Sequence, residues 1–316
     1  MVDLRRIQYK TMQLLEGSTP KSIVITDNGK YVFKANFGYR DKGDLPTSFG
    51  EVFYSEVCKT LGCNCVNVEF AKMELGERLR SGTLIDYFWE EDTLESLSYG
   101  EIALRCNLFG EMDGDEMVVD KILALTKSFA KNNGLKYNEE ESRASLIKLT
   151  ILDYFFAQAD RHFDNIEFLV SEKEMKLAPI FDNGYCFNLW RSMSGNEIDM
   201  PKGLRNIGSA QYLRIYRQSL TGTGECCIID LVDQISKVVK NDKEMRHFVE
   251  DIYRLDIDSL LKKIYDESEK DFNYKYVTNC ADVFNYRKNL LKNYYKEKYT
   301  EDSKNFDVDE DMAFTR

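Results

Sequence analysis

Two short runs, residues 159–168 and 178–184, hold the residue types with the clearest chemistry. Asp160 can accept the proton of an attacking hydroxyl, and Asn165, five positions later, offers an amide oxygen to a metal ion. Asp182 adds a carboxylate after the stretch Ala-Pro-Ile-Phe. Magnesium prefers such oxygen ligands, and phosphoryl transfer from ATP depends mainly on positioning and charge compensation. The three residues therefore predict a magnesium-assisted site for transfer of a phosphoryl group from ATP.

An isolated Asp and Asn at this spacing would more often be turn residues, because both side chains bond to nearby backbone. The flanking sequence favours the chemical interpretation. The apolar stripe of a helix predicted over residues 138–158 ends directly before Asp160, and two short strands are predicted on either side of a turn at 171–174. A strand pair of this kind would place the three oxygen-bearing side chains on one rim.

Two neighbours of Asp160 have other expected roles. Arg161 is expected to anchor the loop or a nearby carboxylate rather than to contact ATP. His162 is assigned to the catalytic loop with Asp160, and two roles stay open for it: bracing the loop through the backbone, or touching the metal or a phosphate.

A phosphate-binding lysine is predicted at Lys34, the end of the third strand of a β-meander between residues 9 and 36. A carboxylate from the following helix, expected over Ser48–Leu61, would hold this lysine. Glu51 and Glu56 both suit that role. The first bend of the meander contains Gly17 and is interpreted as a cover for the phosphates.

The pattern changes near residue 90, from strands to helical periodicity. We therefore predict an α+β fold of two lobes: residues 1–89 with an antiparallel sheet, a phosphate loop and one helix, and residues 90–316 with mainly helices. The expected helices of the second lobe are 94–108, 115–132, 138–158, 228–240, 245–255, 257–265 and 283–299. In the last of these, Arg287 and several lysines are assigned to a solvated face. The acidic stretch 307–311 is expected to be a tail.

Composition excludes some functions. The 316 residues are 43% hydrophobic and 31% charged, with a formal net charge of −11, which is typical of a globular protein. That charge opposes nonspecific binding to nucleic acid, which relies on Lys and Arg. No signal peptide or membrane-spanning segment is recognised. We expect a cytoplasmic protein, in a bacterial cytosol, with secretion lacking a recognisable signal as an alternative.

The eight cysteines include no Cys-x-x-Cys pair, and the chain has two histidines. A structural zinc site is therefore disfavoured, at about one chance in twenty. Cys63 and Cys65, and the pair Cys226 and Cys227, are interpreted as buried free thiols in a reducing compartment.

The run Asp-Arg-His-x-x-Asn, followed by Ala-Pro-Ile-Phe-Asp-Asn-Gly, resembles the HipA-like kinases and more closely their short CtkA-like members. The same pairing is similar to that of the phosphatidylinositol 3/4-kinase clan. The resemblance covers most of the chain in motif order, with identity concentrated in residues 153–187. It implies a two-lobed protein-kinase-like fold, with ATP and Mg²⁺ in the cleft and autophosphorylation as an accompanying activity.

Residue by residue, the resemblance makes Asp160 the base, Asn165 and Asp182 the metal ligands, and Lys34 the phosphate-binding lysine. It favours Glu51 over Glu56 as the carboxylate partner of Lys34. It also places the hinge that faces adenine at residues 84–88. The ATP-binding residues implied in this way are Gly17, Ser18, Thr19, Lys21, Lys34, Glu51, Asp86, Tyr87 and Phe88.

The chain departs from HipA in two ways. It begins almost directly at the kinase sheet, without the N-terminal subdomain that helps HipA to dock an antitoxin, so antitoxin pairing is in doubt. The serine that silences HipA when phosphorylated has no clear equivalent, and the candidate autophosphorylation sites are Ser18, Thr19, Ser22, Ser192 and Ser194.

The leading hypothesis is thus a serine/threonine protein kinase with an unidentified protein substrate. One alternative is a lipid or small-molecule kinase of the same clan, which could use the basic helix 287–298 to contact lipid. The other is a pseudokinase that binds nucleotide without transferring phosphate.

Overall fold

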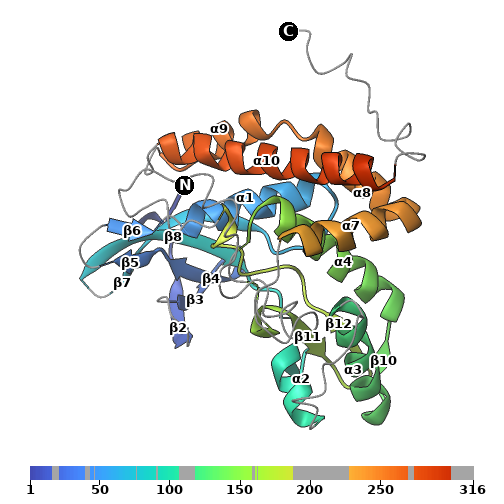
Figure 1. The fold of residues 1–316 in the computed structure, drawn as a ribbon. Helices are drawn as coiled ribbons and strands as arrows, with labels where there is room; N and C mark the ends of the chain where they lie inside the picture. The colour runs from blue at the N-terminus through green and yellow to red at the C-terminus, as the bar shows by residue number, and fades with distance from the viewer. Residues whose placement is uncertain are drawn as a thin grey trace.

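A strand-rich lobe lies beside a mostly helical lobe in the computed structural model of the chain (Figure 1). The structure describes residues 1–15, 21–39, 43–45, 47–75, 77–89, 92–106, 118–158, 161, 163–187, 228–269 and 274–299. The predicted α+β class and two-lobed architecture are confirmed. The boundary drawn between residues 89 and 90 stays a prediction. No helix in the described ranges is long and apolar enough to cross a bilayer.

The N-terminal lobe is built on a six-stranded sheet in the order β1-β7-β8-β4-β3-β2. Its strands are β1 (Val2–Asp3), β2 (Lys10–Leu15), β3 (Lys21–Thr26), β4 (Gly29–Ala35), β7 (Val68–Leu75) and β8 (Arg78–Asp86). β1 pairs with β7 in parallel, and the other neighbours are antiparallel. β2 to β4 are the predicted meander. A short 3₁₀ helix, η1 (Leu4–Arg6), and a hairpin of β5 (Phe37–Tyr39) and β6 (Gly43–Leu45) complete this part.

Alternation along the strands gives this sheet two different faces. One face is covered by a small apolar core that includes Val24, Phe33 and Leu84. On the other face, Val68 and Phe70 belong to a much larger core that continues into the helical lobe. The sheet is therefore apolar on both sides, and its inner face turns toward the second lobe.

Helix α1 (Thr47–Thr60) lies on the inner face and contacts β7 and β8. Its first turn is held by Asn36, just after β4, whose side-chain oxygen accepts hydrogen bonds from the Ser48 amide at 2.9 Å and the Thr47 hydroxyl at 3.3 Å. The helix ends at Gly62, which has φ of +66°, a conformation that costs glycine little. The helix predicted over Ser48–Leu61 is confirmed to within one residue at each end.

The helical lobe surrounds a second sheet in the order β10-β12-β11-β9. Its strands are β9 (Glu95–Ser98), β10 (Lys136–Tyr137), β11 (Glu167–Val170) and β12 (Glu174–Leu177), and the 3₁₀ helix η2 (Phe163–Asn165) precedes β11. The helices are α2 (Tyr99–Arg105), α3 (Val118–Asn132), α4 (Glu139–Phe155), α7 (Ile228–Asn241), α8 (Lys243–Arg254), α9 (Ile257–Glu267) and α10 (Tyr274–Lys298). As predicted, Asn138 caps α4, accepting a hydrogen bond from the Glu141 amide.

Two expectations for this lobe are wrong. The helix predicted over 94–108 begins as a strand, because β9 pairs with β11, and α2 starts only after the capping box of Ser98 and Glu101. The last helix begins at Tyr274, earlier than predicted, and Arg287 is fully buried instead of solvated. Its guanidinium donates to the Tyr154 carbonyl and lies over the Tyr154 ring.

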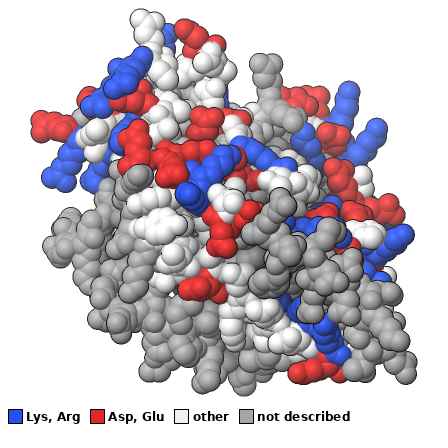
Figure 2. All heavy atoms as spheres, turned by 90° about the horizontal axis from the view of Figure 1, so that it is seen from above, with Lys and Arg blue, Asp and Glu red and all other residues white. Residues whose placement is uncertain are grey.

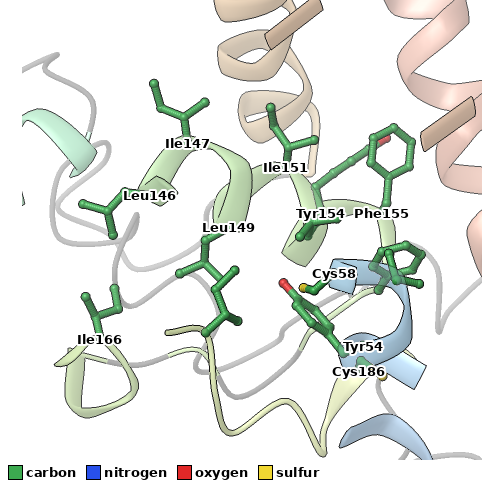
Figure 3. Packing of buried hydrophobic residues seen from close by; sticks show 14 of the residues in the cluster. Tyr54, Cys58, Leu146, Ile147, Leu149, Ile151, Tyr154, Phe155, Ile166 and Cys186 are labelled. Carbon is green, nitrogen blue, oxygen red and sulfur yellow. The ribbon is translucent and has the colours of Figure 1, made fainter. Parts of the chain in front are cut away.

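The two lobes are joined by packing between α1 and α4. Figure 3 shows Tyr54 and Cys58 of α1 beside Tyr154 and Phe155 of α4, all within the large core. The Tyr54 hydroxyl also donates to the buried Asp153 carboxylate at 2.7 Å. On the other side of α1 lies α9, with α10 alongside (Figure 1). Helix α1 is thus held between the sheet and the helical lobe.

Candidate active site

Lys34 is the centre of a buried ionic cluster between the lobes. Its ammonium donates to Glu51 Oε1 at 2.6 Å and to Asp182 Oδ1 at 2.5 Å. The other Glu51 oxygen, Oε2, accepts a hydrogen bond from the backbone amide of Asn183 at 2.8 Å. Lys34 comes from β4, Glu51 from α1 and Asp182 from the segment after β12, so one cation ties three elements together. The glutamate that pairs with Lys34 is Glu51. Glu56 pairs with Lys59 and Lys263 instead.

The charges of this cluster stabilise one another. Burial by itself lowers the pKa of Lys34, but the two carboxylates beside it outweigh burial and raise the pKa well above its usual value. Burial likewise raises the pKa of Asp182, but Lys34, Lys21 and Arg161 outweigh it and hold that pKa at about 2. Lys34 and Asp182 are therefore both charged at neutral pH.

A cavity of about 280 Å³ opens beside this cluster. It is lined by Lys21, Val32, Lys34, Glu51, Ile85, Asp86, Tyr87, Phe88, Trp89, Glu167, Phe181 and Asp182. The cavity has an apolar end and a basic end. The pairing of the strands explains this difference, because residues directly opposite one another on neighbouring strands lie on the same face of the sheet. Val32 faces Ile85 across β4 and β8, and in the next row Lys34 faces Lys21 across β4 and β3. An apolar surface suited to a flat base thus adjoins a basic surface suited to phosphates.

Aromatic side chains form the wall between β8 and the second lobe. Phe88 packs against Phe181 with ring centroids 5.5 Å apart, and Trp89 contacts both Tyr87 and Phe88. The Lys30 ammonium lies 3.6 Å from the centre of the Tyr87 ring, a cation–π geometry. These contacts hold Tyr87, Phe88 and Trp89 beside the cavity, and the assignment of residues 84–88 as the hinge stays a prediction.

Arg161 links α4 to the segments that contain Asn165 and Asp182. Its guanidinium bonds to both oxygens of Asp153, at 2.9 and 3.1 Å, and to the Asn183 side chain at 2.6 Å. It also donates to the Phe181 carbonyl at 3.0 Å and, at 3.5 Å, to the Asn165 carbonyl. All four groups belong to the two segments that hold the predicted metal ligands, or to the helix before them. The expectation that Arg161 anchors the loop or a nearby carboxylate is confirmed for the carboxylate, that of Asp153.

The backbone at Asp182 is strained. Its φ is +55°, which is uncommon for a residue with a side chain and is found mostly where function requires it. The Gln158 side chain donates to the Asp182 carbonyl at 3.1 Å. Together with the bond from Lys34, this contact keeps the carboxylate turned toward the cavity.

Close packing of two glycines allows α1 to approach this segment. A Cβ atom on Gly50 would lie 2.9 Å from the Gly184 carbonyl and 3.1 Å from the Asn183 carbonyl, and one on Gly184 would lie 3.1 Å from Thr47. A Cβ atom at Gly50 would force a shift of the backbone, and one at Gly184 would make a tight contact. The bond between Glu51 and the Asn183 amide depends on this approach.

The donor set fits a magnesium ion held jointly with phosphates. Within the described residues, no three His, Cys, Asp or Glu side chains are placed to hold a metal by themselves. Asp182 lies at the cavity and Asn165 is buried, with its backbone joined to the Phe181 carbonyl through Arg161. Magnesium is usually bound through one or two carboxylates, water and substrate phosphate. Asp182 and Asn165 have the ligand types that such a site would use, and their role as metal ligands stays a prediction.

The structure brings together most of the predicted site residues that it describes. Lys21, Lys34, Glu51, Asp86, Tyr87, Phe88 and Asp182 all line the cavity. Among the described predicted residues, Asn165 does not line it. Gly17, Ser18, Thr19, Asp160 and His162 lie outside the described residues, as do the thiols Cys226 and Cys227.

Other residues of the site were not predicted. Val32 could have been found, since it is two residues before Lys34 and so shares its strand face. Asp153 is an acidic residue within the apolar stripe of α4. An acid at such a position indicates a buried cationic partner, which is Arg161. Glu167 lines the cavity and accepts a bond from Ser96 at 2.5 Å, but its sequence context carries no signal for this position.

The arrangement has the parts of a nucleotide-binding cleft between two lobes. No protein-family model and no curated protein sequence matches the chain. Among solved structures, the proinflammatory kinase CtkA from Helicobacter pylori superposes with a TM-score of 0.69, covering 95% of this chain and 98% of that chain at 14% identity. The HipA–HipB–operator DNA complex of Shewanella oneidensis gives a TM-score of 0.46, covering 94% of this chain and 68% of that chain at 11% identity. The first match shows that the chain has the kinase-like fold implied by its motifs.

Proposed function

We propose that the protein is an ATP- and Mg²⁺-dependent phosphotransferase, and specifically a serine/threonine protein kinase. The observation that carries this proposal is the buried Lys34 ammonium, which pairs with both Glu51 and Asp182. These residues lie at the basic end of a cavity whose opposite end is apolar. A lysine paired with a glutamate beside a metal-binding aspartate is the arrangement by which protein kinases hold ATP phosphates. The similarity in fold to CtkA supports the same conclusion.

Each residue of the site has a role in this proposal. Val32 and Ile85 cover the adenine, and the backbone of residues 86–88 offers it hydrogen bonds. Lys34, fixed by Glu51, binds phosphate oxygens, and Lys21 adds positive charge beside it. Asp182 and Asn165 would hold Mg²⁺, which supplies charge compensation on the phosphates when bound. Asp160, next to the anchored Arg161, accepts the proton of the acceptor hydroxyl.

The lipid-kinase alternative has less support. It relied on the basic residues of α10, but Arg287 is buried, Lys288 donates to the Tyr253 carbonyl and Lys298 pairs with Asp233. In the view of Figure 2, acidic and basic side chains are mixed on the visible surface. Such a surface offers little attraction to anionic lipid. The pseudokinase alternative is disfavoured because the lysine, its glutamate and the proposed metal ligands are all present.

The remaining assignments are part of the same proposal. The partner is a protein substrate, and neither nucleic acid nor an antitoxin is proposed as one. Autophosphorylation is proposed on one of Ser18, Thr19, Ser22, Ser192 and Ser194, and the working location is the cytoplasm.

Transfer of label from γ-labelled ATP tests the proposal. Wild-type protein, Asp160→Asn and Asp182→Asn are each incubated with Mg²⁺, labelled ATP and a cell lysate. We expect the wild type to label serine or threonine in protein, and each variant to lose roughly 100-fold or more of that activity, since base and metal-ligand contributions are of this size or larger.

Asp251→Asn is the matched control, because Asp251 is an exposed residue of α8 paired with Arg254. It should label like the wild type. Undiminished labelling in Asp160→Asn or Asp182→Asn would refute the site assignment. Label recovered in a lipid extract rather than in protein would favour the lipid-kinase alternative.

A further inference from the structure

The C-terminal end of α1 brings two cysteines together through its backbone. Beyond the last helical residue, the Gly62 amide donates to the Lys59 carbonyl at 3.3 Å, and the Cys63 amide donates to the Cys58 carbonyl at 2.8 Å. With Gly62 in the left-handed region, these two bonds form a Schellman motif. In this motif the side chain after the glycine packs on the side chain three residues before the helix end. Here those two side chains are Cys63 and Cys58.

A third thiol adjoins the pair. The sulfurs of Cys63 and Cys65 both lie close enough to the Cys58 thiol to raise its pKa. Cys65 is held differently from Cys63: it forms a parallel bridge with Ile180, and its own thiol donates to the Ser55 carbonyl at 3.7 Å. All three cysteines are free thiols in the structure, but Cys63 and Cys65 are partly exposed, because they follow the end of α1, and not buried as predicted.

We propose that Cys58 and Cys63 form a peroxide-responsive thiol pair, which is oxidised reversibly to a disulfide. The geometry carries this proposal, because the Schellman bonds place the two residues side by side without any rearrangement of the chain. A disulfide requires Cα atoms about 4.4–6.8 Å apart, and the bond from the Cys63 amide to the Cys58 carbonyl, at 2.8 Å, holds the two backbones close together. The proposal is independent of the phosphotransferase activity.

Exposure and charge distinguish the two sulfurs. Cys58 is buried, whereas Cys63 is partly exposed and can meet a small oxidant. Burial raises the pKa of Cys58, and the neighbouring sulfurs of Cys63 and Cys65 raise it further. The adjacent Cys58 thiol lowers the pKa of Cys63, and the nearby Lys148 ammonium acts in the same direction. Cys63 is therefore the sulfur that attacks, since the thiolate is the reactive form.

The oxidation consumes one hydrogen peroxide per disulfide. The Cys63 thiolate attacks one peroxide oxygen; the S–O bond forms, the O–O bond breaks, and the departing hydroxide takes a proton and leaves as water. This step produces a sulfenic acid. The Cys58 sulfur then attacks the Cys63 sulfur, the S–S bond forms, and the sulfenic hydroxyl leaves with the thiol proton as a second water. Two thiols are oxidised and the peroxide is reduced.

The location of the pair makes this modification relevant to the site. Cys58 lies seven residues after Glu51 on the same helix, which is two turns or about 10 Å. Cys63 is followed by the segment whose residue Cys65 pairs with Ile180, two positions before Asp182. Oxidation would therefore fix the end of the helix that carries Glu51 to the loop that contacts the Asp182 segment.

Thiol mapping after peroxide treatment tests the proposal. Native wild-type protein is treated with a small excess of hydrogen peroxide, alkylated, digested and analysed by mass spectrometry, with and without dithiothreitol. We expect the number of alkylatable cysteines to fall by two, and a peptide pair joined through Cys58 and Cys63 that dithiothreitol separates. Cys63→Ser should abolish this crosslink, and Cys65→Ser should retain it.

Other outcomes contradict the assignment. A crosslink of Cys65 to either neighbour in the wild type would show that the Schellman contact does not select the pair. Unchanged thiols, or a sulfinic acid at Cys63 with no crosslink, would refute the resolving role of Cys58. Cys106→Ser, which changes a partly exposed cysteine just after α2, is the control and should oxidise like the wild type.

Discussion

Lys34 is the residue on which the proposed site depends. It is buried and its charge is shared by two carboxylates. A buried charge is stable only when it is paired and hydrogen-bonded. Removing one partner is costly, because the remaining charges stay buried without full compensation. The cluster is thus a sensitive point for stability as well as for ATP binding.

The two glutamates of α1 provide a matched test at this scale. Glu51→Gln removes a charge that is buried against Lys34, and we expect it to lower the free energy of unfolding by roughly 3 kcal/mol. Glu56→Gln removes a partly exposed charge paired with Lys59 and Lys263. That change should cost about 1 kcal/mol or less.

Chemical denaturation of both variants and the wild type measures the difference. Equal losses in the two variants would contradict the assignment of Glu51 as the buried partner. Binding of nucleotide to the folded Glu51→Gln protein would also be weakened, since Lys34 would lose one of its two fixed partners.

At the scale of elements, α1 connects the sheet to the segment that carries Asp182. Its approach depends on Gly50, where a Cβ atom would meet backbone oxygens of Asn183 and Gly184 at 3.1 and 2.9 Å and the Cys186 sulfur at 3.0 Å. Backbone oxygens cannot move aside as the end of a flexible side chain can. The helix itself would have to shift.

Gly50→Ala should therefore destabilise the protein although alanine is the better helix former. Propensity alone would favour alanine by about 1 kcal/mol, but overpacking typically costs roughly 1–3 kcal/mol. We expect a net loss of stability by chemical denaturation, together with weaker labelling from ATP. Thr60→Ala, at the exposed end of the same helix, is the control and should be neutral. A Gly50→Ala protein more stable than the wild type would show that α1 does not pack as closely as described.

Sequence patterns predicted the elements whose signals are local. Helix α1 has a glycine stop, and α4 has a cap and an acidic first turn, so both were placed within a few residues. β9 was mistaken for helix because it pairs with β11, about 70 residues later in the chain. Arg287 was assigned to the solvated face because its partner, the Tyr154 carbonyl, lies far from it in the sequence.

The same distinction applies to the site. Lys34, Asn165 and Asp182 stood in recognisable motifs, and the choice between Glu51 and Glu56 rested on resemblance until the structure placed Glu51 on Lys34. Glu167 could not be predicted, because it lines the cavity together with residues of β4, β8 and α1 that are far from it in the chain.

At the scale of the whole molecule, the lobes share one large core, and α1 belongs to it. Ion pairs at the periphery add to this connection: Lys263 of α9 pairs with Glu56 of α1, and Lys72 of β7 pairs with Glu269 just beyond α9. The contact between Lys34 and Glu51 therefore lies within the framework that joins the two lobes.

The central claim is that the cavity between the lobes binds ATP through Lys34. Calorimetric titration with a nonhydrolysable ATP analogue and Mg²⁺ tests it most directly, using the wild type, Lys34→Met and the control Lys136→Met, which changes an exposed lysine of β10. Circular dichroism confirms first that the variants are folded. We predict one site in the wild type, unchanged affinity in Lys136→Met, and affinity lowered about 10- to 100-fold in Lys34→Met, as expected for loss of a charged hydrogen bond. Equal affinity in Lys34→Met and the wild type would contradict the account.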